Sequence, residues 1–383
     1  MNRRILGPLL SVLLILGVGG AIFISARNQF AARQVVTVKG LIGSEKENFF
    51  RDQRVIDTLR ANGIVVEFEK AGSRQIATNF DLSTYDFAFP AGVPAAEKIR
   101  REQKINKSYE VFFTPMVIAS WKPIAETLVA NGVAKSEKGY YTIDMAKLLQ
   151  LIGDSKRWND LSGNTSYAVN KSILVTSTDV RKSNSAAMYL ALASYVLNGN
   201  KIVQSDQEVE QLSAQLEALF LEQGFTENSS EVPFEDYLVM GMGKAPMVII
   251  YEAQFVAQVP LPNSPITDQM VLLYPQPTIF TKHILVPISA NGEKLGDLLT
   301  TNEDLQKYAV EYGLRNRNTT YWQDFVSQHK LPIPQNLIDV IEPPSYEILE
   351  KMITRIEQRY TETPTAVSLL TQDSRALLSF NSK

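Results

Sequence analysis

The chain of 383 residues contains no cysteine and only two histidines, His283 and His329. Without cysteine it can form no disulfide, no thiolate metal site, no cysteine nucleophile and no lipid anchor attached through a cysteine. Neither histidine has a metal-ligand spacing to the other or to a carboxylate, which favours surface or packing roles for both. We therefore expect no metal site, and the redox compartment cannot be inferred.

Motifs for phosphate binding and acyl transfer are also missing. The sequence has no Gly-x-x-x-x-Gly-Lys-Ser/Thr loop for nucleotide phosphates and no Gly-x-Ser-x-Gly nucleophile turn. The nearest glycine-rich segment, Gly241–Lys244, precedes a predicted strand rather than a helix. A formal net charge of −3 argues against a large nucleic-acid surface. We expect neither an enzyme nor a nucleic-acid-binding protein, and no cofactor.

One stretch lacks charge altogether: it runs from Ile5 to Ala26, directly after Arg3-Arg4. As a helix it would be roughly 33 Å long, enough to cross the hydrocarbon core of a membrane. Cleaved signal peptides have a shorter apolar region and a small-x-small site, which Ile24–Ala26 and Phe30–Ala32 match poorly. We favour an uncleaved anchor over residues 1–33, with cleavage as the alternative. The arginines would keep the N-terminus in the cytoplasm and place the rest outside the cell membrane.

The chain as a whole has the composition of a globular protein, since 45% of residues are hydrophobic and 21% charged. Strand-like runs at Val35–Ile42, Ile64–Phe68 and Tyr85–Phe89 are each followed by a polar turn and a helical pattern. The first helix is expected over 48–62, opened by a Ser-x-x-Glu capping box at Ser44–Glu47. Repeated strand-helix units predict an α/β fold with a parallel sheet. Their turns would gather at the carboxyl ends of the strands, where open α/β sheets bind ligands.

A further strand-turn-helix pattern occupies Ser172–Leu192. Ile173–Val175 is strand-like, and Ser183-Asn184-Ser185 opens a helix that is predicted from Ala186 to Asn198. Serine and asparagine favour helix N-termini because their side chains accept from unpaired backbone N–H groups. Such a helix start can hold an anionic group. The alternative is an ordinary, well-capped junction.

Two strongly apolar strands, Val111–Trp121 and Met247–Tyr251, lie far apart in the chain. The first contains Pro115, which a central paired strand tolerates badly, so it is expected at an edge or between lobes. We predict that the chain leaves one lobe near Val117–Ser120 and returns near Ile249–Glu252. A discontinuous two-lobe arrangement of this kind suits a hinged ligand trap.

The order of these short motifs resembles a known family. The motifs are Gly43-Ser44, Ala71-Gly72-Ser73, Tyr85-Asp86, Thr114–Ala119, Trp158–Leu161, Ser183–Ser185 and Pro246–Val248. Over residues 35–320 the chain is similar to the type II periplasmic-binding-protein fold of the extracellular solute-binding proteins of ABC importers. The resemblance implies two α/β lobes with hinge crossovers, a solute held between them, and a membrane permease as partner. The membrane segment and the long C-terminus depart from the usual pattern.

The expected division of the chain is therefore an anchor, two lobes and an extension. Lobe 1 comprises 34–117 and, after the return, 249–320; lobe 2 comprises 118–248; a helical extension covers 321–383. The predicted ligand-binding residues are Ser44, Glu45, Gly72, Ser73, Arg74, Ser183, Asn184, Ser185, Tyr251 and Glu252.

These residues predict the charge of the ligand. Hydroxyls and free N–H groups at the three turns, together with Arg74, would hold a carboxylate or oxyanion. Glu252 would accept from an amine or hydroxyl, while Tyr251 would close the floor. Arg74 could instead be a solvated first-turn residue, and the serines could serve only as caps. We expect a small anionic or zwitterionic solute.

Two functions remain open. The first is a membrane-tethered extracytoplasmic solute-binding protein that delivers a small molecule or ion to an ABC-type transporter. The second is an extracytoplasmic sensor or scaffold subunit that uses the same fold to contact membrane partners. Neighbouring genes for a permease and an ATPase would favour the first function.

Overall fold

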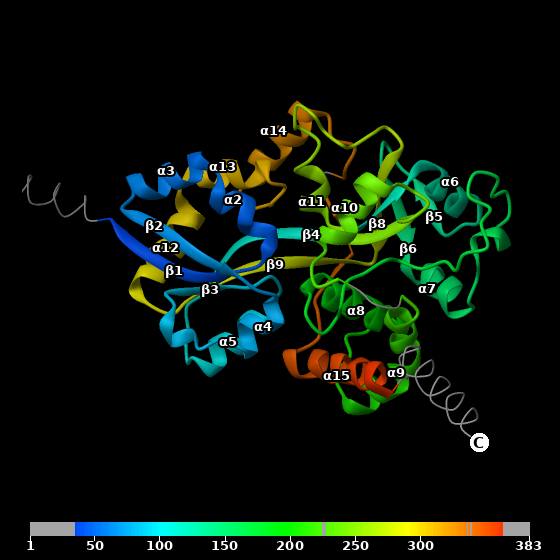
Figure 1. Ribbon diagram of the computed structural model, residues 1–383, viewed down its shortest axis with the longest axis horizontal. Helices are drawn as coiled ribbons and strands as arrows, with labels where there is room; N and C mark the ends of the chain where they lie inside the picture. The colour runs from blue at the N-terminus through cyan, green and yellow to red at the C-terminus, as the bar shows by residue number, and fades with distance from the viewer. Residues whose placement is uncertain (1–34, 224–226, 335, 338, 363–383) are drawn as a thin grey trace, which may run out of the picture.

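The computed structural model describes residues 35–223, 227–334, 336–337 and 339–362. The expected membrane anchor, residues 1–33, lies outside these ranges. Within them, no helix is both long enough and apolar enough to cross a membrane. The described chain forms a connected mixed sheet with the strand order β2-β1-β3-β9-β4-β8-β6-β5, and helices cover it on both sides (Figure 1).

The first lobe is built on a parallel core. β1 (Val36–Ile42) lies between β2 (Ile64–Lys70) and β3 (Phe87–Phe89) and is parallel to both. Parallel neighbours require crossover connections, so the three predicted strand-helix units are confirmed. The helices of this lobe are α2 (Glu47–Arg51), α3 (Gln53–Ala61), α4 (Ser73–Thr78), α5 (Val93–Glu102), α12 (Ala290–Thr301) and α13 (Glu303–Glu311).

The second lobe has a mixed sheet. β8 (Met270–Gln276) is antiparallel to β4 and parallel to β6 (Tyr141–Asp144), and β5 (Ala134–Ser136) forms the outer edge. The helices of this lobe are α6 (Lys122–Ala130), α7 (Met145–Gly153), α8 (Asn184–Leu197), α9 (Asp206–Leu221), α10 (Glu231–Met240) and α11 (Glu252–Val256). The polar segment before α8 runs along the side of the lobe that faces lobe 1.

Two long strands, β4 (Tyr109–Trp121) and β9 (Thr278–Pro287), connect the lobes through the middle of the molecule (Figure 1). The first half of β4 pairs with β9, whereas its second half pairs with β7 (Met247–Tyr251) and β8. Pro115 is the last residue in register with β9, so its missing N–H falls where the partner changes. The expectation that this proline-containing strand runs between lobes agrees with its position.

The predicted return at Ile249–Glu252 is wrong. β7 pairs with β4 and, through Thr176, with the segment before α8, so it stays within the second lobe. The strand that rejoins the first lobe is β9, which pairs antiparallel with β3. The error has a physical cause, because a strand buried on both faces is a continuous apolar run wherever it lies in the sheet.

Three local predictions also fail. Ile173–Val175 forms no strand, since Ser172 and Thr176 make only isolated bridges. The expected helix over 48–62 is divided at Asp52, whose side chain caps α3 by accepting from the N–H of Arg54. The capping box at Ser44 is absent, because the short 3-10 helix η1 (Ser44–Lys46) begins there without a side-chain cap.

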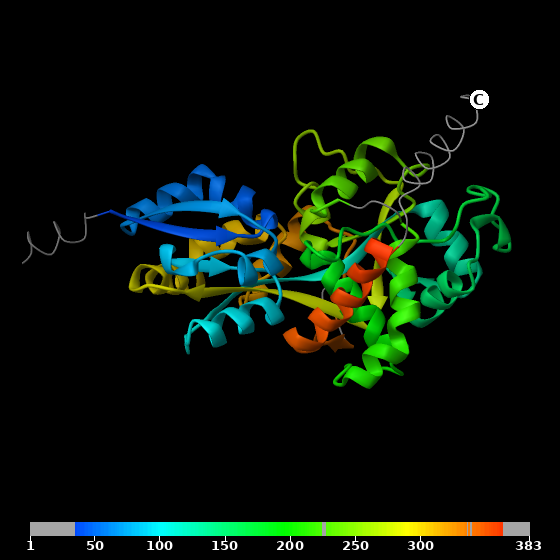
Figure 2. The same cartoon turned by 60° about the horizontal axis from the view of Figure 1, so that its bottom comes forward.

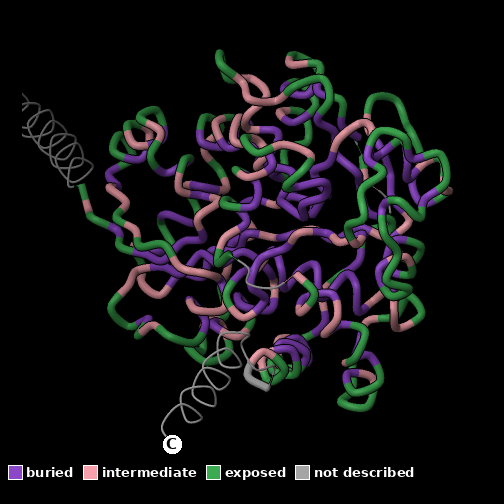
Figure 3. Tube along the Cα trace, turned by 45° about the vertical axis from the view of Figure 1, so that its right-hand side comes forward, coloured by how far each residue is buried: buried purple, intermediate pink, exposed green. Residues whose placement is uncertain are grey.

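The chain ends its described part with α14 (Thr319–His329), β10 (Val340–Ile341) and α15 (Tyr346–Glu362). α14 packs Trp322, Phe325 and Val326 into a hydrophobic cluster with side chains of β4, β7 and β8. Burial follows the strands through the centre of the molecule, and exposed residues lie mainly in the outer turns and loops (Figure 3). The lobes are thus connected by paired strands and by a hydrophobic cluster that contains residues of both.

Candidate functional site

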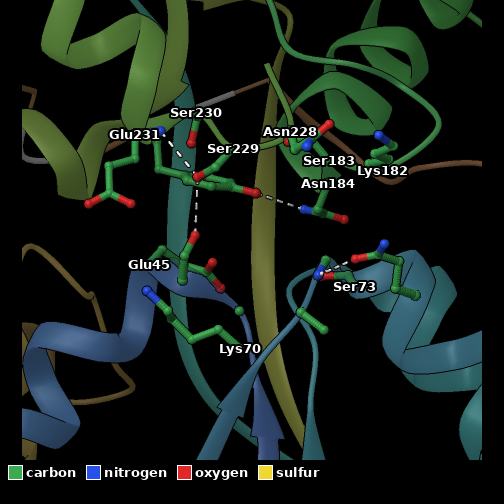
Figure 4. A pocket seen from close by; sticks show the side chains of 16 residues that line it. Glu45, Lys70, Ser73, Lys182, Ser183, Asn184, Asn228, Ser229, Ser230 and Glu231 are labelled. Atoms are coloured by element: carbon green, nitrogen blue, oxygen red, sulfur yellow. Dashed lines mark hydrogen bonds between the residues drawn. The ribbon is translucent and has the colours of Figure 1, made fainter. Parts of the chain in front are cut away.

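A cavity of about 340 Å³ lies between the lobes, at the carboxyl ends of β1 and β2 (Figure 4). Residues of both lobes line it, and nearly all are polar. They are Gly43, Ser44, Glu45, Lys70, Ala71, Gly72, Ser73, Gln75, Lys182, Ser183, Asn184, Asn228, Ser229, Ser230, Glu231 and Tyr251. The cavity is large enough for a small molecule, and its polar side chains can form hydrogen bonds with one.

Strand ends and helix starts position these side chains. On the first lobe, the turns after β1 and β2 supply Ser44 and Ser73. On the second lobe, the start of α8 and the end of β7 supply Asn184 and Tyr251, and the Asn184 amide donates to the Tyr251 hydroxyl at 3.1 Å. The hydroxyls of Ser44 and Ser229 lie 3.3 Å apart and link the two lobes directly (Figure 4).

The N-terminus of α8 faces this space without a side-chain cap. Ser183 has the extended backbone of an N-cap residue, but its hydroxyl lies 2.9 Å from that of Ser185 instead of binding the first turn. The backbone N–H groups of a helix start carry partial positive charge. A helix start without a side-chain cap can receive an anionic group of a bound molecule.

A buried charged cluster lies beneath the opposite wall. The Lys46 ammonium, fully buried, donates to the Glu45 carboxylate and lies 3.1 Å from His283 Nδ1. Burial lowers the pKa of Lys46. Burial alone would raise the pKa of Glu45, but the Lys46 charge and the contact with His283 more than offset it, so that the pKa is lowered. Glu45 thus presents an ionised carboxylate to the cavity.

His283 is neutral in this cluster. Burial, together with the adjacent Lys46 charge, lowers its pKa to about 4. Its Nδ1 lies 3.2 Å from Glu45 Oε1, while its Nε2 has no hydrogen-bond partner within the described residues. His283 is on β9, the strand that returns to the first lobe, so the cluster ties the β1 turn to a connecting strand.

Most of the predicted site residues meet at this cavity. They are Ser44, Glu45, Gly72, Ser73, Ser183, Asn184 and Tyr251. The Ser73 hydroxyl is buried and accepts from the Ala91 N–H at 2.8 Å, so it shapes the wall as well as lining it.

Three predicted residues do not line the cavity. The Arg74 side chain is directed towards α15, where its Nε donates to both carboxylate oxygens of Glu350 at 2.8 and 2.9 Å. Ser185 is buried between the hydroxyls of Thr178 and Ser183. Side-chain direction decides these cases, because adjacent residues of one turn point to different sides.

Glu252 is likewise displaced from the predicted cavity floor. It lies in the core, where Arg315 binds both carboxylate oxygens at 2.7 and 2.8 Å and Tyr274 donates at 2.7 Å. The carboxylate is therefore satisfied by the protein. Its position one residue after Tyr251, at the start of α11, turns it away from the cavity.

Sequence reasoning missed several lining residues, among them Lys70, Gln75, Lys182 and the run Asn228–Glu231. The polar run before α10 carried a signal, because Asn-Ser-Ser before an apolar stretch is typical of a helix start. Lys46, which is buried next to Glu45 and does not line the cavity, carried no such signal, since nothing in a Glu-Lys-Glu sequence marks the lysine as buried.

The space between the two lobes that contains the cavity is called the cleft below. Its two edges, which we call the lips of the cleft, are Gly72 of the first lobe and Lys182 of the second, and they are in contact. A Cβ added to Gly72 would lie 2.2 Å from the carbonyl oxygen of Lys182, and one added to Gly92 would lie 2.5 Å from Asn184 Oδ1. The first lobe therefore approaches the start of α8 more closely than any side chain permits. The two lobes are therefore in direct contact beside the cavity.

Comparisons with known proteins give a fold. No family model and no curated protein matches the chain. Among solved structures, the apo ferric ion-binding protein A of Pasteurella haemolytica superposes with a TM-score of 0.53 at 11% identity, covering 84% of this chain and 97% of that one. The ferric binding protein of Campylobacter jejuni gives 0.53 at 10%, covering 85% and 99%. The chain has the type II periplasmic-binding-protein fold.

A third structure with this fold is the sulfate-binding protein SubI of Mycobacterium tuberculosis, with a TM-score of 0.51 at 14% identity, covering 82% of this chain and 96% of the other. The titles of all three name binding proteins, for ferric ion or for sulfate. The periplasmic-binding-protein fold agrees with the resemblance deduced from the sequence motifs. The identities are low, so the likeness concerns architecture and not the ligand.

Proposed function

We propose that this protein is an extracytoplasmic solute-binding protein that encloses a small polar ligand between two lobes and delivers it to an ABC-type membrane permease. The observation that carries the proposal is the cavity of about 340 Å³ at the carboxyl ends of β1 and β2, to which both lobes contribute polar side chains. Ligands of open α/β sheets bind at such strand ends. The similar solved structures are named as binding proteins, which supports a binding rather than a catalytic role.

The proposed ligand is anionic or zwitterionic. The uncapped start of α8 favours a negative group, by roughly 0.3–1 kcal/mol and up to about 2 when partly buried. Lys182, at the lip beside it, adds positive charge. Glu45, on the opposite wall, can accept from an amine or hydroxyl of the same molecule. Arg74 is paired with Glu350 and is not proposed as a ligand contact.

We also propose that residues 1–33 tether the protein to the membrane as a single-pass anchor, with both lobes outside. Beyond this anchor, the proposed boundary between the lobes lies on β4 and β9, the two strands that connect them. A tethered binding protein stays close to its permease, which raises its effective concentration there.

The second candidate, a sensor or scaffold subunit, is favoured by one observation. The lips of the cleft touch at Gly72 and Lys182, and α15 contacts both lobes beside this point. A subunit that remains closed would suit a static contact with a membrane partner better than repeated delivery of a solute.

A thermal-shift screen of the full chain in detergent tests the first candidate. The probes are inorganic oxyanions, metal ions, amino acids, sugars and short peptides. A ligand at one hundred times its dissociation constant should add about 2.7 kcal/mol to the free energy of unfolding. If no probe stabilises the chain, while a membrane partner co-purifies with it, the scaffold function replaces solute binding.

A further inference from the structure

α15 lies on one side of the molecule and contacts both lobes (Figure 2). It lies along α9 of the second lobe, and its first turns reach α4 and α5 of the first lobe. We call α15 (Tyr346–Glu362) the strap helix. It lies beside the point where Gly72 meets Lys182, so it is placed to hold the lips of the cleft together.

The contact with the second lobe is extensive and partly apolar. One face of the strap helix is buried in the same hydrophobic cluster as the inner face of α9. The buried residues are Ile348, Leu349, Met352, Ile353 and Ile356. Ion pairs flank this face: Lys351 with Asp206, Arg355 with Glu210, and Arg359 with Glu217. The strap helix is therefore a fixed part of the second lobe.

The contact with the first lobe is polar and uses only the beginning of the strap helix. Glu350 pairs with Arg74 of α4, and Glu347 pairs with Arg101 of α5. Lys98 lies 5.3 Å from the centre of the Tyr346 ring. Arg101 and Glu347 are 62% and 50% exposed, so water and salt can compete for this pair. The Arg74–Glu350 pair is half-buried, with side chains 31% and 21% exposed.

Arg74 joins the strap helix and both lobes at one point. Its Nε binds the Glu350 carboxylate, while one of its terminal nitrogens donates to the carbonyl of Arg181 at 3.1 Å. Arg181 directly precedes Lys182 at the lip of the second lobe. Opening the cleft by moving the first lobe away must break both contacts.

We propose that the strap helix is a conformational latch: it remains on α9 and holds the cleft closed through Glu350–Arg74 and Glu347–Arg101, so exchange of cleft contents requires these two pairs to part. The proposal does not depend on the identity or existence of a ligand. It assigns to Arg74 the control of opening in place of ligand contact.

Energy transfer between two dyes tests this latch on the full chain. Because the chain has no native cysteine, Ala61→Cys on α3 and Ala146→Cys on α7 give one exposed label on each lobe. Into this labelled parent we would introduce Glu347→Gln with Glu350→Gln. The matched control, Lys351→Gln with Arg355→Gln, also removes two ion pairs of the strap helix, but those that face α9.

We expect the Glu347/Glu350 variant to raise the fraction of molecules with a longer inter-lobe distance at least threefold, and the control to leave it unchanged. The parent should open further in 1 M salt, where charges are screened within about 3 Å, while the variant should respond little. Equal distances in parent and variant, or equal opening by variant and control, would overturn the proposal. If the double variant does not fold, Arg101→Gln, at an exposed position, replaces it and is judged by the same criteria.

Discussion

A few buried ionisable side chains determine how the stability of this protein depends on pH and on substitution. The fold buries Lys46, His283 and the Glu252–Arg315 pair, although a buried ion is costly unless it is compensated. In each case a partner comes from a segment distant in sequence. These residues therefore hold separate parts of the chain together, and their replacement should lower the free energy of unfolding of the whole protein.

The first prediction concerns pH. The pKa of His283 is lowered from 6.5 to about 4 in the folded protein. Between these values the unfolded chain binds a proton that the folded chain does not, so stability is complete above pH 6.5 and falls as the pH drops towards 4. The full shift corresponds to about 3 kcal/mol. The lowered pKa of Glu45 acts in the same direction at still lower pH.

Urea unfolding between about pH 7.5 and 4.5 measures this effect in the parent and in His283→Gln. The difference in free energy of unfolding between the two should shrink as the pH falls, because only the parent loses the histidine contribution. His329→Gln, at the only other histidine of the sequence, is the control for loss of an imidazole outside the cluster. A difference that stays constant over this range would contradict the assignment of a neutral, buried His283.

The second prediction concerns the core ion pair. Glu252→Ala would leave the Arg315 guanidinium, 6% exposed, without a carboxylate, and should lower the free energy of unfolding by about 3–5 kcal/mol. Glu303→Ala is the control, because it removes an exposed pair with Lys307 and should cost at most about 1 kcal/mol. Chemical denaturation compares them. Similar losses in both variants would show that the Glu252 pair is not buried in solution.

At the scale of elements, the close approach of α4 to the start of α8 defines the closed cleft. Gly72 precedes α4, and the Lys182 carbonyl lies next to the N-cap of α8. Real Cβ atoms do not come within 3.0 Å of a backbone atom, and a Cβ at Gly72 would lie at 2.2 Å. The absence of a side chain at this position is therefore required for the lips to meet.

Gly72→Ala should accordingly push the lips apart. We expect a longer inter-lobe distance and a loss of about 1–3 kcal/mol, the usual cost of overpacking. Gly243→Ala is the matched control, since no atom lies within 4 Å of its added Cβ. Energy transfer between labels on α3 and α7 reports the distance. If Gly72→Ala behaves like the control, the contact of the lips does not persist in solution.

At the scale of the whole molecule, local patterns predicted the architecture better than the direction of side chains. The strand-helix units around β1, β2 and β3 were predicted correctly, because the periodicity of apolar residues and the turn residues indicate the same elements there. The order of motifs then pointed to the two-lobe fold. The return through β7 was wrong because the apolar run of a buried strand does not reveal its neighbour, and β8, as apolar as β7, was not predicted at all.

The candidate site was predicted from turns, and seven of its ten predicted residues line the cavity. Turns at strand ends share one edge of a sheet, so Ser44 and Ser73 both line the cavity, whereas Ser183 reaches it from the second lobe, at the start of α8. Arg74 and Glu252 differ, because their partners, Glu350 and Arg315, lie far away in the sequence. Pairings over such separations leave no local signal.

A prediction for the whole chain concerns the anchor. The stretch from Ile5 to Ala26 lacks charge and a good cleavage site, so we expect the mature protein to keep it. N-terminal sequencing of protein from the membrane fraction should begin at or near Met1. A start near Arg27 or Arg33 would instead identify a cleaved signal peptide.

The last prediction concerns closure itself. A ligand shifts an equilibrium between open and closed states only by its differential affinity for them. If nearly all molecules are closed without ligand, the ligand can lower the open population only slightly. The latch therefore implies that a saturating ligand changes the radius of gyration of the parent very little. The Glu347→Gln, Glu350→Gln variant, with a larger open fraction, should contract measurably. Small-angle X-ray scattering of both chains, with and without a probe that stabilises them, makes the comparison. A parent that contracts as much as the variant would mean that ligand, and not the strap helix, closes the cleft.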